Sequence, residues 1–494
     1  MASTLDRPGI AQLSDPALFR QQAFVDGTWI DAAAGATIAV DDPASGQVIG
    51  AIPDCGTAET QRAVDAAARA LPAWRALPAA QRCAIIEKWY ALMIAATDDL
   101  AAIMTAEQGK PLAEARGEIA YAASFLKWFA AEGLRVYGHE VPAPTADRRI
   151  LVRKEPVGVC AAITPWNFPA AMITRKVAPA LAAGCTMVVK PSELTPFSAL
   201  ALAVLAERAG VPAGVLSIVT GRPDAIGEVL TGTPVVRLLS FTGSTRVGSL
   251  LMRQCAGTIK KLGLELGGNA PFIVFDDADL DLAIEGAMAS KFRNAGQTCV
   301  CANRILVQAG IHDAFVARLG EKVRALKVGQ GTDAGTSIGP LINQAARTKV
   351  ADHRADALAK GAAVAAEAEA PEGFTAPMVL TGADTSMLLA QEETFGPVAA
   401  IFRFETEAEA IAIANDTPFG LAAYFYTDDL HRAWRVGEAL EFGMVGLNTG
   451  ALSMEVAPFG GVKQSGLGRE GGFEGLDEFL ETKAIHWAGL KAAQ

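Results

Sequence analysis

The amino-acid sequence predicts an α/β fold built from two units in which strands and helices alternate. The chain has 494 residues, which is too long for one ordinary core and favours two or three domains. Hydrophobic residues make up 51% of the chain and charged residues 20%, as in a folded globular protein. Short apolar runs alternate with helical patterns in two stretches, which is typical of doubly wound parallel sheets.

Helices are expected to dominate the first part of the chain. Residues 57–135 contain long Ala-rich amphipathic runs. The pattern changes near Ile150, and short apolar strands then alternate with helices. We expect strands at 157–163, 186–189, 215–219 and 236–241, and helices at 168–183, 198–209, 225–230 and 245–255. This order predicts a parallel, doubly wound sheet.

A second alternation predicts another α/β domain from about residue 266 to 460. We expect its strands at 270–275, 304–307, 362–366 and 398–404, and its helices at 280–292, 311–326, 344–360 and 407–413. The apolar stretch 485–490 predicts a terminal strand.

Composition and charge argue against several kinds of partner. The net charge is −11 and no run of Lys and Arg occurs, so nucleic acid is not expected as a partner. No apolar stretch reaches the roughly 18 residues of a membrane span. The N-terminal region carries Asp6 and Asp15 without an apolar signal core, and the seven cysteines form no spaced framework, so we expect a cytoplasmic protein. The five scattered histidines form no ligand motif, so no metal site is expected.

The segment 292–301 has the sequence FRNAGQTCVC and is the densest cluster of chemically useful residues. Cys299 could act as a nucleophile, because Gly296 would allow a tight backbone turn beneath a substrate. The amide of Cys299 could then point at a developing oxyanion. A buried structural cysteine near a helix end is the alternative, and for a lone cysteine it is the commoner case.

Two further segments carry polar residues close to expected strands. Glu265, within LELGGNAP at 264–271, could be a general base that activates water against an acyl-enzyme, or an exposed loop acid. The segment TPWNFP at 164–169 follows the first strand of its sheet, where open α/β sheets hold ligands. The Asn167 amide could hydrogen-bond an oxyanion, or it could simply cap the next helix.

Two loops could hold a dinucleotide. VVKPSE at 188–193 ends the second strand, where an acid such as Glu193 hydrogen-bonds a ribose 2′-hydroxyl in dinucleotide folds, and Lys190 could reach the same sugar. FTGSTRVG at 241–248 ends the last expected strand of this sheet and opens a helix. Amides around Gly243 and Ser244 could therefore approach a pyrophosphate. The spacing is not GxGxxG, so an ordinary strand–helix turn stays open for each loop.

Together these segments resemble the aldehyde dehydrogenase superfamily, from about residue 20 to the end of the chain. EETFGP at 392–397 and PFGG at 458–461 match it as well. The resemblance implies oxidation of an aldehyde to an acid through a thioester on Cys299, with Asn167 stabilising the oxyanion and Glu265 activating water. NAD is the expected cofactor, with NADP as the alternative. The residues implied to hold it are Trp166, Lys190, Glu193, Gly243, Ser244, Glu393 and Phe395.

A narrower resemblance, to succinate-semialdehyde dehydrogenases, rests on segments 172–176, 290–301 and 455–470. In that branch two arginines and a serine hold the substrate carboxylate, and they map onto Arg175, Arg293 and Ser453. Guanidinium groups suit carboxylates, although a surface or interdomain salt bridge is the alternative for each arginine. Glutarate semialdehyde, or a broader range of aldehydes, stays open as the substrate, because one methylene discriminates by only ~1–3 kcal/mol.

The family resemblance also implies the domain plan. It predicts a variant Rossmann cofactor domain at 1–131 and 152–265, an α/β catalytic domain at 266–474, and a small bridging sheet at 132–151 and 475–494. Strand edges exposed in such a bridging sheet need partners, so we expect a homodimer or homotetramer.

Cys301 carries a separate hypothesis. Some family members with this Cys-Val-Cys pattern close a reversible disulfide, which predicts an oxidative switch. A structural role is the alternative, because so short a loop strains a disulfide.

Three other functions fit these residues less well than a dehydrogenase does. A cofactor-free thiol hydrolase would leave the two dinucleotide loops without a purpose. A non-catalytic protein on the same fold need not keep Cys299, Glu265 and Asn167 together. Relatives that acylate coenzyme A typically lack the general base, so Glu265 argues against that activity.

Overall fold

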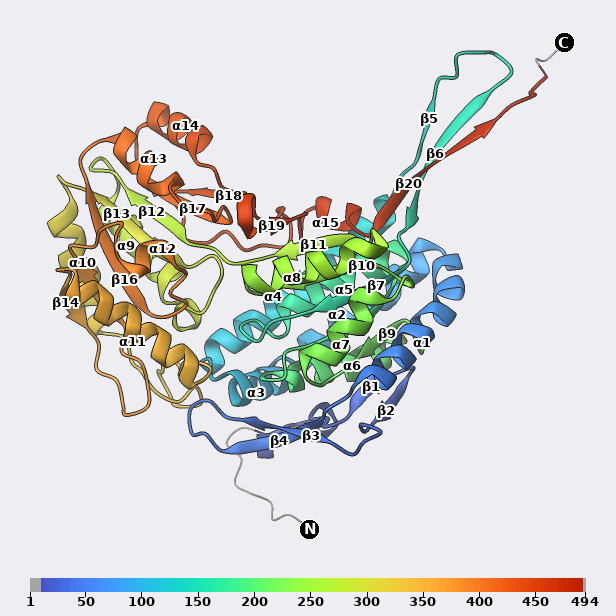
Figure 1. Cartoon of the computed structure of the whole chain (residues 1–494), viewed down its shortest axis with the longest axis horizontal. Coiled ribbons are helices and arrows are strands. Elements are labelled where there is room, and N and C mark those ends of the chain that lie inside the picture. The colour runs from blue at the N-terminus through green and yellow to red at the C-terminus, as the bar shows by residue number, and fades with distance from the viewer. Residues whose placement is uncertain (1–9, 492–494) are drawn as a thin grey trace.

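The structure is a computed structural model, and it describes residues 10–491. Two large sheets with their helices form two lobes, and a three-stranded sheet projects from the body as an arm (Figure 1). The α/β class predicted from the sequence is confirmed. Asp6 and the outermost ends of the predicted cofactor and bridging segments lie outside the described residues.

The first large sheet has eight strands, and its five central strands run parallel. In spatial order they are β19 (Gly466–Leu467), β11 (Lys261–Glu265), β10 (Val236–Thr242), β7 (Val159–Ile163), β8 (Thr186–Lys190), β9 (Leu216–Ile218), β1 (Ala23–Val25) and β2 (Thr28–Ile30). The four strands predicted here are present, with ends shifted by one or two residues.

One expectation about this sheet is wrong. Strand 236–241 is not its last parallel strand, because β11 pairs with β10 and sets Glu265 opposite Thr242. The strand β11 is short, contains a glycine and is only half-buried over its first three residues, so its sequence lacks an apolar run.

The helices of this lobe follow the predicted order. They are α1 (Thr57–Ala76), α2 (Ala79–Ala95), α3 (Thr97–Gln108), α4 (Leu112–Glu132), α5 (Ala171–Ala183), α6 (Pro196–Ala209), α7 (Pro223–Gly232) and α8 (Thr245–Cys255). Helix α5 begins at residue 171 rather than 168, since Pro165 and Pro169 favour an irregular segment before it.

The second large sheet has seven strands, and only the pairing of β14 with β15 is antiparallel. In spatial order they are β14 (Ala363–Glu367), β15 (Met378–Thr381), β16 (Val398–Phe404), β13 (Ala302–Gln308), β12 (Ala270–Val274), β17 (Ala422–Tyr426) and β18 (Met444–Leu447). Its helices are α9 (Leu280–Lys291), α10 (His312–Arg324), α11 (Gln344–Ala359), α12 (Leu388–Gln391), α13 (Glu407–Asn415) and α14 (Leu430–Ala439). The sequence did not predict β15, β17 or β18.

The arm consists of β5 (His139–Val141), β6 (Arg149–Pro156) and β20 (Leu480–Trp487), paired antiparallel, and it extends away from both lobes (Figure 1). The predicted terminal strand at 485–490 has the wrong bounds. Seven of the eight residues of β20 are exposed, so an apolar run does not mark where this strand begins. The short helix α15 (Glu474–Asp477) precedes it, and β3 (Thr37–Asp41) pairs with β4 (Val48–Pro53) near the N-terminal end.

The parallel pairing positions the candidate site. The carboxyl ends of β7, β8, β10 and β11 meet at one edge of the first sheet. The loops with Asn167, Glu193 and Gly243, together with Glu265 at the last position of β11, therefore lie along the same edge. Among the described residues, no helix is both long and apolar enough to cross a membrane.

Candidate active site

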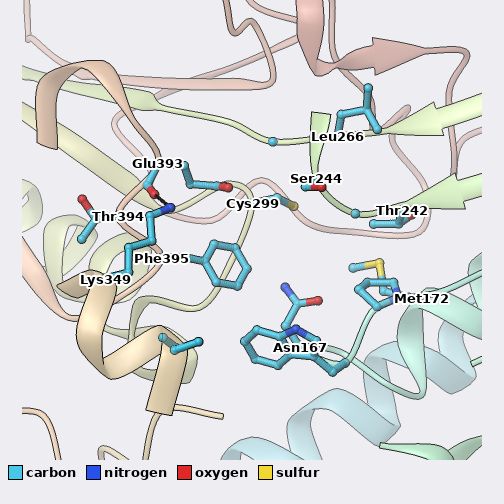
Figure 2. A pocket seen from close by; sticks show the side chains of 16 residues that line it. Asn167, Met172, Thr242, Ser244, Leu266, Cys299, Lys349, Glu393, Thr394 and Phe395 are labelled. Carbon is cyan, nitrogen blue, oxygen red and sulfur yellow. Dashed lines mark hydrogen bonds between the residues drawn. The ribbon is translucent and has the colours of Figure 1, made fainter. Parts of the chain in front are cut away.

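A cavity of about 380 Å³, here called the main cavity, lies between this sheet edge and the segment that carries Cys299 (Figure 2). It is lined by Pro165, Trp166, Asn167, Met172, Thr242, Gly243, Ser244, Leu266, Gly267, Cys299, Ala345, Ala346, Lys349, Glu393, Thr394 and Phe395. Seven residues singled out from the sequence thus meet around one space: Trp166, Asn167, Gly243, Ser244, Cys299, Glu393 and Phe395.

Cys299 lies between a 3-10 turn at Arg293–Gly296 and strand β13, and its side chain is partly exposed. Two glycines permit close backbone approach here. A Cβ on Gly268 would lie 2.4 Å from the Cys299 carbonyl oxygen, and one on Gly296 would lie 2.3 Å from the Gly396 carbonyl oxygen. Desolvation, with the Glu393 carboxylate nearby, raises the pKa of Cys299 to about 12. The thiol is therefore mainly protonated at neutral pH, and it would have to lose its proton to act as a nucleophile.

Asn167 is buried at the wall of the main cavity, close to Cys299 in Figure 2. Its Nδ2 donates a hydrogen bond to the Gln297 carbonyl oxygen at 3.0 Å. An amide nitrogen has two N–H groups, so the second one is available for another acceptor. Asn167 therefore offers a fixed donor in the same cavity that Cys299 lines.

Glu265 is fully buried, but its carboxylate does not line the main cavity. It lines a separate cavity of about 20 Å³, here called the Glu265 cavity, together with Arg175, Ser240, Arg469 and Glu470. Neither carboxylate oxygen has a hydrogen-bond partner among the described residues. Burial, and then the negative charge of Glu470, raise the pKa of Glu265 well above its usual value.

The residues predicted to hold the cofactor divide into two groups. Gly243 and Ser244 line the main cavity at the start of α8, where Ser244 Oγ accepts from the Val247 amide at 3.4 Å. Lys190 and Glu193 lie outside the main cavity, at the end of β8. Their side chains form an ion pair of 2.6 Å.

Among the residues that line the main cavity, the rings of Trp166 and Phe395 meet edge to face with centroids 5.6 Å apart. Phe395 has a φ of 56°, which is costly for a bulky residue and indicates that the surrounding packing holds the ring in place. Burial raises the pKa of Glu393 to about 7, although the Gly268 amide donates to its carboxylate at 3.3 Å.

The three residues predicted to hold a substrate carboxylate meet on the far side of Cys299. Arg175, Arg293 and Ser453 line a cavity of about 10 Å³, here called the arginine pocket, and Cys299 lines it too. The rest of its wall is Tyr121, Phe168, Met172, Thr298, Val300 and Phe459. Cys299 and Met172 therefore line both the main cavity and the arginine pocket, and Cys299 is the only one of the two with a nucleophilic side chain.

A model of the aldehyde dehydrogenase family matches residues 29–485. The chain belongs to this family. It is 61% identical over 475 residues to a glutarate-semialdehyde dehydrogenase of Pseudomonas putida, covering 96% of this chain and 99% of that protein. It is equally 61% identical over 475 residues to the NADP(+) succinate-semialdehyde dehydrogenase GabD of Escherichia coli, covering 96% and 98%. The crystal structure of an aldehyde dehydrogenase from Brucella melitensis biovar abortus matches with a TM-score of 0.96 and 61% identity, covering 97% of this chain and 100% of that chain.

These matches confirm the resemblance inferred from the sequence, both to the aldehyde dehydrogenase family and to its semialdehyde dehydrogenases. The role of each site residue stays a prediction. So does the oxidative switch: Cys301 is buried with its Sγ 3.4 Å from the Lys291 carbonyl oxygen, and Cys299 and Cys301 are both free thiols.

Sequence reasoning assigned no role to several residues at this site. Lys349 of α11 reaches the main cavity and donates to the Glu393 carbonyl oxygen at 2.6 Å (Figure 2). Lys176 and Glu470 form a buried ion pair beside the Glu265 cavity. These pairs join residues far apart in the chain, so no local pattern could have indicated them.

A buried ion pair holds the backbone of residues 167–171, the segment that carries Asn167. Lys110 and Glu118 are 1% exposed and form a salt bridge. Lys110 Nζ also donates to the Asn167 carbonyl oxygen at 2.9 Å. Glu118 Oε1 accepts from the amides of Ala170 and Ala171 at 3.0 and 3.3 Å, just at the start of α5. The pair therefore fixes the segment on both sides of Phe168.

Asn294 connects the segment that carries Cys299 to the backbone of Asn167. Its Nδ2 donates to the Asn167 carbonyl oxygen at 3.0 Å, and its Oδ1 accepts from Gln108 Nε2 at 3.0 Å. Its amide donates to a Glu114 carboxylate oxygen at 3.0 Å. Asn294 has a φ of 52°, a conformation that these contacts stabilise against a cost of about 1–3 kcal/mol.

We predict that Lys110→Met will destabilise the protein by about 3–5 kcal/mol, because it leaves the buried Glu118 carboxylate without its cation. The free energy of unfolding, from urea denaturation, is the measurement. Arg116→Met is the matched control, since its ion pair with Asp98 is exposed and should contribute less than about 1 kcal/mol. Equal losses in the two variants would contradict this account of the buried pair.

Proposed function

We propose that this protein oxidises an aldehyde with a distal carboxylate, succinate semialdehyde or a similar ω-oxo acid, to the dicarboxylate with NAD(P). The position of Cys299 carries this proposal, because it lines both the main cavity and the arginine pocket. The main cavity has features that suit a nucleotide cofactor, and the arginine pocket has donors that suit a carboxylate. A substrate anchored at the arginines would present its aldehyde carbon toward the thiol between the two spaces.

The residues of the main cavity fit a dinucleotide. Helix α8 begins at its wall with no acidic residue in the first turn, so the free amides and the dipole suit a pyrophosphate. Trp166 and Phe395 offer apolar ring surfaces for the nicotinamide end, and Glu393 and Lys190 would orient the riboses. When bound, the nicotinamide supplies the acceptor for the hydride that the substrate loses.

The side chains around Cys299 support acyl transfer. The deprotonated Sγ adds to the aldehyde carbon, and the carbonyl oxygen becomes an oxyanion. The second N–H of Asn167 Nδ2 and the amide of Cys299 stabilise this charge. Oxidation then leaves a thioester on Cys299.

Glu265 completes the turnover as general base. Its carboxylate takes a proton from water while the water oxygen bonds to the thioester carbon and the C–S bond breaks. The raised pKa of Glu265 makes its carboxylate a stronger base than that of an ordinary glutamate. Because its oxygens line the Glu265 cavity, the side chain would turn toward the thioester for this step.

The two relatives at 61% identity bear the names of a glutarate-semialdehyde and a succinate-semialdehyde dehydrogenase, which supports an ω-oxo acid as substrate. Succinate semialdehyde is the first candidate and glutarate semialdehyde the second. For the cofactor we propose NAD over NADP, because the carboxylate of Glu193 would repel a 2′-phosphate.

The domain plan and the assembly are part of the proposal. The cofactor domain would comprise residues 1–131 and 152–265, the catalytic domain 266–474, and the bridging segment 132–151 and 475–494. The arm carries exposed Trp487 and Ile485 and open strand edges, which support a homodimer or homotetramer. The seven free thiols support a reducing, cytoplasmic setting.

We predict that Arg293→Ala will lower kcat/KM for succinate semialdehyde by roughly ten- to a hundredfold, because a charge-assisted hydrogen bond contributes ~1.5–3 kcal/mol. Activity on butanal, which lacks the carboxylate, should change little. Steady-state kinetics on both aldehydes, with thermal melts to verify folding, are the test of the proposed function. An equal loss on both substrates would show that Arg293 is structural and would refute its assignment to the carboxylate.

Glu265→Gln should allow the first oxidation but slow thioester hydrolysis, since the amide cannot accept the proton from water. Stopped-flow mixing should show a burst of reduced cofactor followed by a slow phase. Cys299→Ala, which lacks the thiol, is the control and should show no burst. Loss of the burst in Glu265→Gln would indicate that Glu265 acts before the oxidation, as the base that deprotonates the thiol.

Glu193→Ser should raise kcat/KM with NADP relative to NAD, because it removes the charge that opposes the 2′-phosphate and leaves Lys190 unpaired. The ratio of kcat/KM for the two cofactors is the measurement. Equal use of both cofactors by the wild type, unchanged in the variant, would exclude this role for Glu193.

A further inference from the structure

We propose that Arg175, held in place by Glu470, couples the carboxylate end of the substrate to the ionisation of Glu265, whereas Arg293 only binds the substrate. The inference deepens the proposed function and rests on it for the identity of the substrate. Arg175 and Arg293 thus have different roles, although the sequence predicts for both that they bind the substrate carboxylate.

Arg175 lies between two spaces. It is 1% exposed and lines both the arginine pocket and the Glu265 cavity. On one side its Nε forms an ion pair with Glu470 Oε2 at 2.6 Å. Its Nη2 is buried without a hydrogen-bond partner among the described residues. One part of the guanidinium is thus paired with Glu470, and Nη2 keeps its hydrogen-bonding capacity unused.

Glu470 connects this arginine to the surroundings of the general base. Its Oε1 pairs with Lys176 Nζ, which also donates to Thr242 Oγ1 at 2.7 Å, at the strand position opposite Glu265. The charged groups that face Glu265 are Arg175, Lys176, Arg469, Glu470 and Glu478.

Arg293 has a different setting. It is only half-buried, and its guanidinium stacks on the Phe168 ring at 4.8 Å. In the part of the chain that the structure describes it makes no ion pair, and it does not line the Glu265 cavity. A carboxylate bound at Arg293 therefore has no short route to Glu265 through that side chain.

The sign of the coupling follows from the charges. The positive charge of Arg175 lowers the pKa of Glu265 against the larger effect of burial. A substrate carboxylate at Arg175 Nη2 offsets part of that charge, so the pKa of Glu265 rises in an acyl-enzyme with a distal carboxylate. Removing the arginine charge raises this pKa for every acyl group, while Lys176 keeps Glu470 ionised.

The test measures acyl-enzyme hydrolysis directly. Enzyme mixed with NAD and either succinate semialdehyde or butanal is quenched in acid at intervals, and the acyl adduct is followed by intact-protein mass spectrometry across the acidic pH range. In the wild type, the pH at which hydrolysis falls to half should be higher for the succinyl enzyme than for the butanoyl enzyme. Arg175→Met should move the butanoyl midpoint up by about one pH unit and slow hydrolysis about tenfold below it.

Two matched variants complete the design. Arg175→Lys keeps the charge and should restore the wild-type butanoyl midpoint, and Arg293→Met should leave that midpoint unchanged while it weakens use of succinate semialdehyde. An unchanged midpoint in folded Arg175→Met, or an equal shift in Arg293→Met, overturns the coupling. If Arg175→Met does not fold, identical succinyl and butanoyl midpoints in the wild type overturn it instead.

The butanal arm also separates the two proposals. A wild type without preference for succinate semialdehyde over butanal refutes the proposed substrate. The butanoyl midpoints in wild type and Arg175→Met still decide whether Arg175 controls Glu265.

Discussion

The salt bridge between Lys110 and Glu118 is the interaction on which the site geometry depends. It is buried at the junction of helices α3 and α4 with the first sheet. Besides pairing with each other, Lys110 and Glu118 each make a further hydrogen bond to the backbone. The lysine holds the carbonyl of Asn167 while the glutamate holds the first amides of α5. A buried pair of this kind adds little net stability compared with apolar residues, but it penalises any shift of the segment that would leave a charge unpaired. The ion pair therefore makes the segment that carries Asn167 rigid.

Asn294 links the segment fixed by this salt bridge in the first lobe to the segment that carries Cys299. Its side chain meets the same carbonyl oxygen of Asn167 that Lys110 holds, so the donor amide and the segment leading to Cys299 share one anchor. Consecutive left-handed residues at 294–296 turn the chain sharply before the thiol. Cys299 and Asn167 come from different lobes, and hydrogen bonds between their segments help to set their relative position.

Much of this arrangement could be predicted from the sequence, because its determinants are local. The apolar runs of β7, β8 and β10 and the motifs around Asn167, Glu265 and Cys299 are visible in short windows. Strand β11 and the exposed strand β20 lack an apolar run and were missed or misplaced. Lys349 and Glu470 could not be found, since their contacts join segments more than forty residues apart. The unequal settings of Arg175 and Arg293 are likewise a property of packing, not of spacing.

The raised pKa of Cys299, about 12, affects how fast the ligand-free protein reacts with electrophiles and oxidants. At neutral pH the protonated thiol therefore dominates, and alkylating agents and peroxides react with thiolates far faster than with thiols. A ligand that changes the charges around Cys299 would change its ionisation, and with it the reactivity of the thiol toward electrophiles. Screens for covalent inhibitors that use the protein alone would under-report its reactivity, and those run during turnover would reveal it.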